Sequence, residues 1–286
     1  MANESSNRVP HDGVISFLAQ RILPTYGRRM IHPTAIVDER AVLGEGVEIG
    51  PFCIVEGAVE IGDRTHLAPN AIIRKNTRIG ADCKIDSFSV IGGEPNYLGF
   101  DPATPSGVTL GDRCVIRESV TIHRSIHADT HTTVGDEVFM MANSHLGHDC
   151  IIGDRVVMAN TSAMAGHVTV GNDTFFGGGA MVHQFARIGE GAMVAGLSRI
   201  TRDIGPFILV GERDEISGLN LIGLRRRKVP TETIRELKHL YHAILRSKGN
   251  PIENAAQQTR PSSPEARTFQ EFFISSKRGY AKNVVA

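Results

Sequence analysis

An apolar residue recurs at every sixth position over most of this 286-residue chain. The repeat runs from Ile31 to Ile91, resumes at Leu110 for three hexads and, after a second interruption at Ser125–Thr133, continues from Val134 to Ile200. A period of six fits neither the 3.6-residue turn of an α-helix nor simple strand alternation. It predicts a parallel β-solenoid with three hexads per coil, in which short strands form flat faces and the apolar residue points inward.

The other hexad positions agree with a narrow prism. Small residues follow the apolar one by four places, and all four cysteines (Cys53, Cys83, Cys114 and Cys150) occupy that position. We therefore expect buried thiols without disulfides, as in a cytoplasmic protein. Cys114 and Cys150 are expected two coils apart, too far for a disulfide. Turns that need unusual backbone angles are expected at the glycines directly after the apolar position, which are Gly44, Gly50, Gly62, Gly80, Gly135, Gly153, Gly171 and Gly189.

The extent of the repeat divides the chain into three parts. We predict an N-terminal extension over residues 1–29, a solenoid over residues 30–211 and a C-terminal helical domain over residues 212–286. In the extension, Val14–Leu23 forms either a short helix that caps the solenoid or part of an unordered segment. The predicted fold class is therefore an all-β solenoid plus α.

Two helices are expected in the C-terminal domain. The apolar stripe of Thr231–Gly249 predicts an amphipathic helix, with Thr233 and Glu236 as a capping box. After a linker, a second helix is expected to begin at Ser263–Pro264 and to end near Gly279.

Charge and hydropathy exclude several classes of protein. The chain carries 31 basic and 31 acidic residues, which argues against a nucleic-acid binder. No apolar run is long enough to span a membrane, and residues 1–29 lack the pattern of a secretory signal. Residues 225–286, however, hold 13 Lys or Arg against five Glu. This basic region indicates either an anionic small molecule or acidic protein partner, or simply a solvated helical face.

Histidines recur near the coil spacing. His148, His167 and His183 are each separated by close to three hexads, so we expect them to form a column along one edge of the solenoid. His145 lies on the same turn as His148, and Asp149 follows directly. An imidazole titrates near neutral pH and can serve as a general base. Three histidines can also hold zinc, as in the hexad-solenoid carbonic anhydrases, so a metal site is the alternative.

Four further segments carry a family resemblance, together with the histidine segments. They are His32-Pro-Thr-Ala-Ile-Val37, Ile49-Gly-Pro-Phe-Cys-Ile-Val55, Arg117-Glu-Ser-Val-Thr-Ile-His-Arg124 and Gly223-Leu-Arg-Arg-Arg227. From Ile31 to Gly279 the chain resembles the UDP-N-acetylglucosamine O-acyltransferases that open lipid A biosynthesis. The resemblance implies a left-handed β-helix and a homotrimer with sites between subunits. It also implies transfer of an (R)-3-hydroxyacyl group from acyl carrier protein to the 3-hydroxyl of the sugar.

The resemblance assigns roles to individual residues. It implies that His148 is the general base, that Asp149 orients it and that the Gly166 N–H stabilises the oxyanion. The guanidinium groups of Arg226 and Arg227 suit the phosphates of UDP. Substrate-binding residues implied by the resemblance are His145, His167, His183, Gln184, Gly196, Asn220, Arg226 and Arg227. No cofactor or metal is expected in catalysis, and the basic C-terminal region is expected to steer the acidic carrier protein.

Some positions depart from the family pattern. Tyr97 and Gly99 stand where the family has an Asp-x-Lys motif that touches the sugar, and Ile222 replaces a glutamate. These losses change what the sugar end can discriminate. Gly196 falls where the family sets acyl length, and a glycine there favours a longer chain.

Three alternatives to this transferase therefore stay open. The first is a paralogue that acylates a different UDP-amino sugar on oxygen or nitrogen, or that uses coenzyme A thioesters. The second is a non-catalytic hexad protein that has kept the fold for binding. The third is a zinc hydratase.

Overall fold

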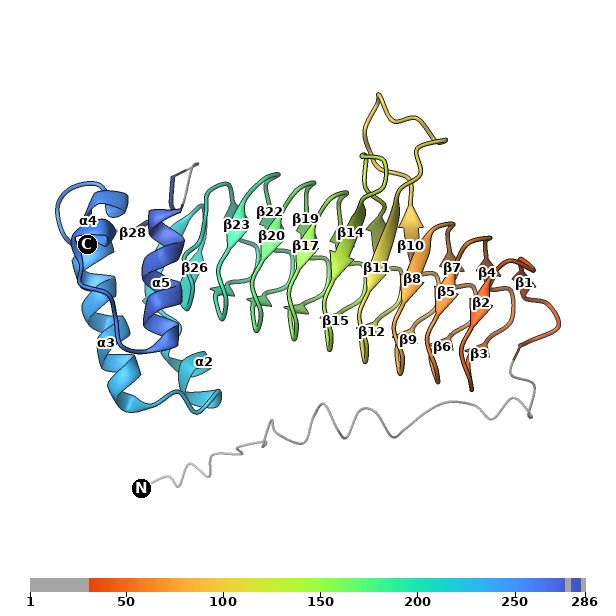
Figure 1. Cartoon of the computed structure of the whole chain (residues 1–286), viewed down its shortest axis with the longest axis horizontal. Coiled ribbons are helices and arrows are strands. Elements are labelled where there is room, and N and C mark those ends of the chain that lie inside the picture. Colours follow the sequence, from red (N-terminus) through yellow and green to blue (C-terminus); the bar gives the residue numbers. More distant parts are fainter. Residues whose placement is uncertain (1–30, 276–278, 284–286) are drawn as a thin grey trace, which may run out of the picture.

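Stacked coils form a long prism with helices packed at one end. This computed structural model describes residues 31–275 and 279–283 (Figure 1). The predicted extension over residues 1–29, with its alternative helix at Val14–Leu23, lies outside the described residues. In Figure 1 the first coil and the helices lie at opposite ends of the prism.

Each full coil contributes one short strand to each of three sheets, named here by their first strands. The β1 sheet contains β1 (Ile36–Val37), β4 (Ile54–Val55), β7 (Ile72–Ile73), β10 (Val90–Gly93), β13 (Thr121–His123), β16 (His145–Leu146), β19 (Ala163–Met164), β22 (Met181–Val182) and β25 (Arg199–Ile200). The β2 sheet contains β2 (Val42–Leu43), β5 (Glu60–Ile61), β8 (Thr77–Ile79), β11 (Gly107–Leu110), β14 (His131–Val134), β17 (Ile151–Ile152), β20 (Thr169–Val170) and β23 (Arg187–Ile188). The β3 sheet contains β3 (Glu48–Ile49), β6 (His66–Leu67), β9 (Lys84–Ile85), β12 (Val115–Ile116), β15 (Phe139–Met140), β18 (Val157–Met158), β21 (Phe175–Phe176), β24 (Met193–Val194), β26 (Ile208–Gly211), β27 (Glu215–Leu219) and β28 (Lys282–Asn283).

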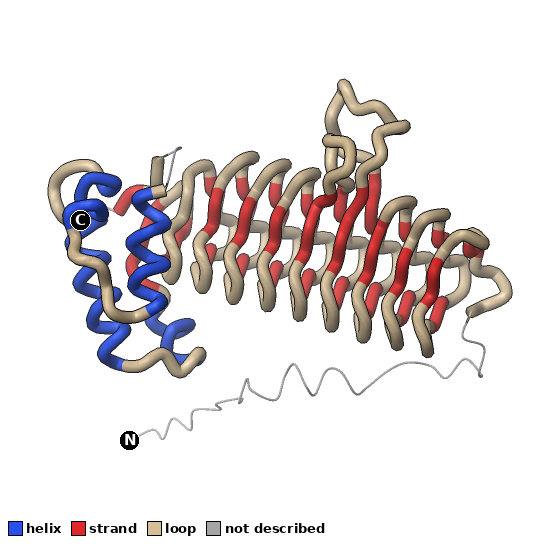
Figure 2. The backbone as a smooth tube through the Cα atoms, viewed as in Figure 1, coloured by secondary structure: helices blue, strands red, loops and turns tan. Residues whose placement is uncertain are grey.

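The strand register confirms three hexads per coil. Ile54 pairs with Ile72, which occupies the same position three hexads further along the chain. Where the hexads are interrupted, Ile91 pairs with Ile122 and Ile122 with Leu146, so these two coils are longer than three hexads. The extra residues form loops over residues 94–106 and 124–130 that project from the prism (Figure 2).

The apolar hexad residues form the core, as predicted. Ile73, Ile85 and Leu146 are fully buried, whereas Ile31 in the first coil is 41% exposed because only one side of that coil is covered by another described coil. The cysteines are buried and free, as expected. The expected relation between Cys114 and Cys150 is wrong, because the longer coil between Ile122 and Leu146 shifts the register. These two residues precede strands of different sheets.

The expected role of the hexad glycines is also wrong. The left-handed turn residue lies two places further along, for example Arg64 (φ 56°) after Gly62 and Asp82 (φ 57°) after Gly80. The glycines instead allow the coils to stack closely. A Cβ at Gly62 would lie 2.6 Å from the backbone nitrogen of Ala81 in the next coil.

The β3 sheet continues past the last hexad. Strand β26 pairs in parallel with β24 and in antiparallel with β27, which in turn pairs with β28. The boundary predicted after Gly211 falls within the β26–β27 hairpin. Within the described residues that follow lie four α-helices and one π-helical turn, namely α2 (Leu221–Arg226), α3 (Thr231–Tyr241), η2 (His242–Arg246), α4 (Pro251–Gln257) and α5 (Pro264–Ile274).

The helices match the sequence prediction in part. Helix α3 and η2 cover the predicted first helix to within one turn of its end, and α5 begins at the predicted position, with Ser263 as its N-cap. The capping box is wrong: Pro230 occupies the N-cap position of α3 without a side-chain hydrogen bond, and the Glu236 carboxylate accepts hydrogen bonds from Ser262 and Ser263 at the start of α5.

Two helices were not predicted. The segment expected to be a linker contains α4, which begins at the proline of an Asn-Pro pair. Helix α2 is short and follows β27 directly. None of the helices within the described residues has the length and apolar character that a membrane crossing requires.

Candidate active site

A groove of about 560 Å³ runs along the outer face of the β1 sheet, within the size range of small-molecule sites. Strands β13, β16, β19, β22 and β25 form its floor, and the turns that lead from these strands to the β2 sheet form one wall. Those turns are called the β1/β2 corner below. The groove is lined by Asn96, His123, His145, Gly147, His148, Ala163, Met164, Ala165, Gly166, Met181, Val182, His183, Gln184, Arg199, Ile200 and Thr201.

His148 and Asp149 form the turn after β16. The left-handed conformation of Asp149 (φ 61°) lets its side chain reach back, so that Oδ2 lies 2.8 Å from Nδ1 of His148. The same carboxylate accepts hydrogen bonds from the hydroxyl of Ser125 and the backbone N–H of Ile126. Both partners belong to the 124–130 loop, which therefore holds Asp149 in place.

The electrostatics of Asp149 select one tautomer of His148. Burial raises the pKa of the Asp149 carboxyl, but hydrogen bonds from Ser125, His148 and Ile126 outweigh burial and lower the pKa below its usual value. The carboxylate is therefore ionised at neutral pH and can only accept hydrogen bonds. Nδ1 of His148 must then carry the proton, which leaves the lone pair of Nε2 available as a base.

Gly166 belongs to the coil after that of His148 and lies against the His148 imidazole. A Cβ at this position would lie 2.5 Å from Cε1 and 2.6 Å from Nε2 of His148, so only glycine leaves room for the ring. The Gly166 N–H donates no hydrogen bond to any residue that the structure describes. An N–H next to the basic nitrogen can donate a hydrogen bond to a carbonyl oxygen under attack and so stabilise the negative charge that develops on this oxygen.

The histidines do not form the expected single column. Coil stacking places Asp149 beside His167, and the His167 amide N–H donates to the carbonyl oxygen of His148. His183 follows His167 by two residues fewer than a full coil contains. Phe185 therefore occupies the turn position equivalent to that of His167, and His183 lies two residues before Phe185. The His167 ring stacks on Phe185 at 4.5 Å and meets the His148 ring edge-on at 5.0 Å.

The groove brings five predicted residues together, namely His145, His148, Gly166, His183 and Gln184. Asp149 and His167 lie directly behind them at the β1/β2 corner. His183 and Gln184 are exposed, so their side chains face the open groove.

Other predicted substrate residues lie away from the groove. Gly196 is exposed at the corner where β24 turns into β25, on the opposite edge of the β1 sheet. Asn220 caps α2 by accepting from the Gly223 N–H, while its amide nitrogen donates to Gly191. Arg227 pairs with Asp173 and Glu190, and Arg226 is exposed on α2.

The prediction missed two residues beside His145, namely Thr121 and His123. Nδ1 of His145 lies 2.7 Å from the hydroxyl oxygen of Thr121, and the His145 ring contacts the ring of His123 at 4.7 Å. Burial, aided by the neighbouring His145 and His148, lowers the pKa of His123 to about 4. The sequence signal that could have revealed this contact was the interruption of the repeat. A coil of four hexads stacks Thr121 on His145, whereas a coil of three hexads does not.

The positions that depart from the family pattern lie in two different parts of the structure, the 94–106 loop and helix α2. Tyr97 and Gly99 belong to the 94–106 loop, which brings Asn96 to the groove. Arg124, with a side chain only 1% exposed, holds this loop by donating to the carbonyl oxygens of Pro102 and Thr104. Ile222 is 64% exposed on α2.

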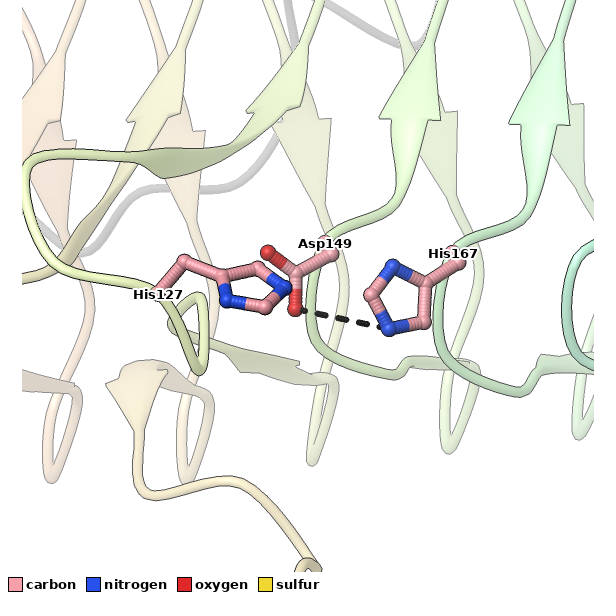
Figure 3. Close-up of side chains that lie close together, drawn as sticks. All are labelled: His127, Asp149 and His167. Carbon is pink, nitrogen blue, oxygen red and sulfur yellow. Dashed lines mark ion pairs between the residues drawn. The ribbon is translucent and has the colours of Figure 1, made fainter. Parts of the chain in front are cut away.

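One group of side chains in the described part of the chain has the composition of a metal site. Ligand atoms of His127, Asp149 and His167 lie within 4.8 Å of one another, with His127 and His167 on opposite sides of the carboxylate (Figure 3). This group differs from the trio of His148, His167 and His183 that the zinc alternative suggested, because coil stacking pairs His167 with Asp149.

Comparisons with known proteins agree with this geometry. The family described as "Udp N-acetylglucosamine O-acyltransferase; Domain 2" matches residues 203–281, and the family "Bacterial transferase hexapeptide (six repeats)" matches residues 40–75. The acyl-[acyl-carrier-protein]–UDP-N-acetylglucosamine O-acyltransferase of Campylobacter lari is 41% identical over 87% of this chain and 95% of its own length.

Solved structures show the same likeness. LpxA from Acinetobacter baumannii superposes with a TM-score of 0.85 at 32% identity, over 89% of this chain and all of that one. The UDP-N-acetylglucosamine acyltransferase from Campylobacter jejuni gives a TM-score of 0.83 at 35% identity, over 88% of this chain and 99% of that one. The predicted left-handed parallel β-helix with C-terminal helices is thereby confirmed. The chain belongs to the acyl-[acyl-carrier-protein]–UDP-N-acetylglucosamine O-acyltransferase family.

Proposed function

We propose that this protein transfers an (R)-3-hydroxyacyl group from acyl carrier protein to the 3-hydroxyl of UDP-N-acetylglucosamine, the first step of lipid A biosynthesis. Family membership supports the reaction class. The observation that carries the mechanism is the His148 imidazole, held by Asp149 at 2.8 Å with Nε2 beside Gly166 in an open groove. A base, its orienting carboxylate and an available N–H donor are the groups that acyl transfer requires.

The proposed reaction proceeds in two steps. Nε2 of His148 accepts the proton of the sugar hydroxyl as the hydroxyl oxygen bonds to the thioester carbonyl carbon, and the Gly166 N–H stabilises the resulting oxyanion. The carbonyl then re-forms, the carbon–sulfur bond breaks and the thiolate takes the proton from the imidazolium. Asp149 stabilises that imidazolium between the two steps, and neither step needs a cofactor.

The separation of the predicted nucleotide-binding residues supports a homotrimer. Arg227 and Asn220 contact the turns between the β2 and β3 sheets, whereas His148 lies at the β1/β2 corner. In a threefold assembly, groups from different corners of neighbouring prisms can face one site. Exposed apolar side chains on the β1 sheet and at its edge, including Ile36 (68% exposed) and Phe88 (62% exposed), give such an assembly a surface to bury. We propose that the enzyme works in the cytoplasm, where acyl carrier protein is its partner.

The departures from the family pattern favour an alternative function with a different acceptor sugar. Tyr97 is 53% exposed on the loop that reaches the groove, and it stands where the family has a carboxylate. This replacement supports the alternative in which the acceptor is another UDP-amino sugar, acylated on oxygen or nitrogen. Gly196 leaves the opposite edge of the sheet open, and we propose that it admits a longer acyl chain. Purified protein assayed against several UDP-sugars, with acyl carrier protein and coenzyme A thioesters of different lengths, separates these possibilities.

The replacement His148→Ala tests the mechanism. We expect it to abolish acyl transfer and to leave the circular dichroism spectrum and melting temperature close to those of the wild type. His239→Ala, which removes an exposed histidine of α3, serves as the matched control. Near-wild-type turnover by His148→Ala refutes the assignment of the base. Absence of any thioester-dependent product with the wild type favours the non-catalytic alternative, and stoichiometric zinc by elemental analysis together with hydratase activity favours the hydratase.

A further inference from the structure

His127, Asp149 and His167 form a cluster whose metal-binding capacity the acyl-transfer mechanism does not use. His167 and Asp149 occupy equivalent turn positions in adjacent coils, and Nε2 of His167 lies 4.0 Å from Oδ2 of Asp149. His127 approaches from the other side, on the 124–130 loop (Figure 3). Two imidazoles and a carboxylate are the donor set that zinc and similar divalent transition metals prefer.

The backbone holds these three groups in place before any metal binds. The His127 amide N–H donates to the hydroxyl of Ser125, and the His127 carbonyl oxygen accepts from the hydroxyl of Thr130. The His167 ring stacks parallel to Phe185, with an interplanar angle of 5°, which sets its plane. The His127 side chain is exposed and can make the small adjustment that completes the site.

The ionisation states also suit a metal. Burial lowers the pKa of His167, so its ring is neutral at pH 7 and offers a lone pair. The carboxylate of Asp149 is ionised for the reasons given above. Zinc ligands lie about 2 Å from the metal and about 3.4 Å from one another. The present separations, all within 4.8 Å, therefore need shifts of about 1 Å.

We propose that the β1/β2 corner binds a divalent cation of the zinc class through His127, Asp149 and His167, and that the bound cation inhibits acyl transfer. Oδ2 of Asp149 accepts the hydrogen bond of His148 and is also the carboxylate oxygen that lies 4.0 Å from Nε2 of His167. A cation on that oxygen competes for its lone pairs and places positive charge close to His148. The imidazole then loses the hydrogen bond that orients it, so its basic nitrogen is no longer held beside Gly166. The binding part of the proposal stands on geometry alone, and the inhibitory part rests on the proposed function.

Zinc chloride added to the tag-free, metal-stripped full-length protein tests both parts. Isothermal titration calorimetry on the wild type is expected to show one zinc ion per chain, and buffered free zinc is expected to inhibit transfer over the same concentration range. His127→Ala removes a ligand that has no part in the proposed chemistry. We expect it to retain transfer activity within about twofold and to weaken both zinc binding and zinc inhibition by at least about tenfold. His239→Ala, the matched control on α3, should behave as the wild type.

The outcomes separate the two parts. Wild-type zinc affinity in His127→Ala, or no binding by the wild type at about 0.1 mM free zinc, overturns the site. Binding that depends on His127 without inhibition overturns the inhibitory role alone. If the wild type shows no transfer even without zinc, the proposed function fails while calorimetry still decides the metal site.

Discussion

Two corners of the prism share one backbone geometry and differ in what they carry. At the β2/β3 corner, formed by the turns that lead from the β2 sheet to the β3 sheet, successive left-handed turn residues alternate in charge, and they are Arg64, Asp82, Arg113, Glu137, Arg155 and Asp173. Stacked pairs form ion pairs such as Arg64–Asp82 at 2.7 Å and Arg155–Asp173 at 2.8 Å. At the β1/β2 corner the equivalent positions hold Asp149, His167 and Phe185, with φ between 61° and 66°.

Burial distinguishes the two corners. The Arg64 and Asp82 side chains are 61% and 43% exposed, whereas those of His148 and Asp149 are 16% and 11% exposed. The 124–130 loop covers the second corner and supplies Ser125 and Ile126 as donors to Asp149. The same turn geometry therefore carries exposed ion pairs at the β2/β3 corner, where solvent reaches it. At the β1/β2 corner, where a loop covers it, the turn carries an acid–base site, because burial strengthens each electrostatic interaction.

Among the changes that test this comparison of corners, removing the charge of Asp149 should have the largest effect. Asp149→Asn keeps the size of the side chain but can no longer hold the Nδ1–H tautomer of His148 through a carboxylate. We expect kcat for acyl transfer to fall by about 10³-fold. Asp82→Asn makes the same change at an equivalent turn position on the β2/β3 corner and should leave kcat unchanged. Equal kcat values for the two variants would show that the corners do not differ in function.

Adding one methyl group beside His148 should have the next largest effect. The Cβ of Gly166→Ala would lie 2.5 Å from Cε1 of His148 and displace the ring, so we expect kcat to fall by about 10²-fold. Gly178→Ala is the matched control, because its Cβ meets only the carbonyl oxygen of Asn160, at 3.4 Å. A crystal structure of Gly166→Ala with His148 unmoved, together with full activity, contradicts the predicted crowding.

The buried histidines of the groove predict a loss of stability in acid. The pKa of His123 is lowered from 6.5 to about 4 in the folded protein, so between these pH values the unfolded chain binds a proton that the folded chain does not. Folding stability therefore decreases as the pH falls through this range. His123→Gln removes this contribution, so we expect its melting temperature to drop less than that of the wild type between pH 7 and pH 5. An equal or larger drop rejects the burial of an uncharged His123.

The smallest effect is expected at the charge ladder. Arg155→Ala removes a half-exposed ion pair with Asp173, which can still pair with Arg227. We expect the free energy of unfolding to fall by about 1 kcal/mol or less, and transfer activity to stay at the wild-type level. Urea unfolding measures the first quantity. A loss of several kcal/mol would show that the ladder stabilises the solenoid far more than an exposed pair can.

The hexads predicted much of the fold because their signal is local. Each apolar residue at a sixth position points into the prism whatever its neighbours do, and residues such as Ile73 and Leu146 are fully buried. The C-terminal region was predicted less well because its signals are short. Helix α4 begins at an Asn-Pro pair within an apparent linker, and Glu236 accepts hydrogen bonds from Ser262 and Ser263 at the start of α5 instead of capping its own helix.

The sequence alone determined the solenoid and its three hexads per coil, because both follow from spacing along one chain. The family resemblance implied the pairing of His148 with Asp149. Only the tertiary structure decided that Thr121 stacks on His145, that Ser125 reaches Asp149 and that His127 faces His167. The physical reason is the pair of inserted loops. They lengthen the coil from Ile91 to Ile122 and the coil from Ile122 to Leu146, and so change which side chains become neighbours, in a way that the hexad period cannot reveal.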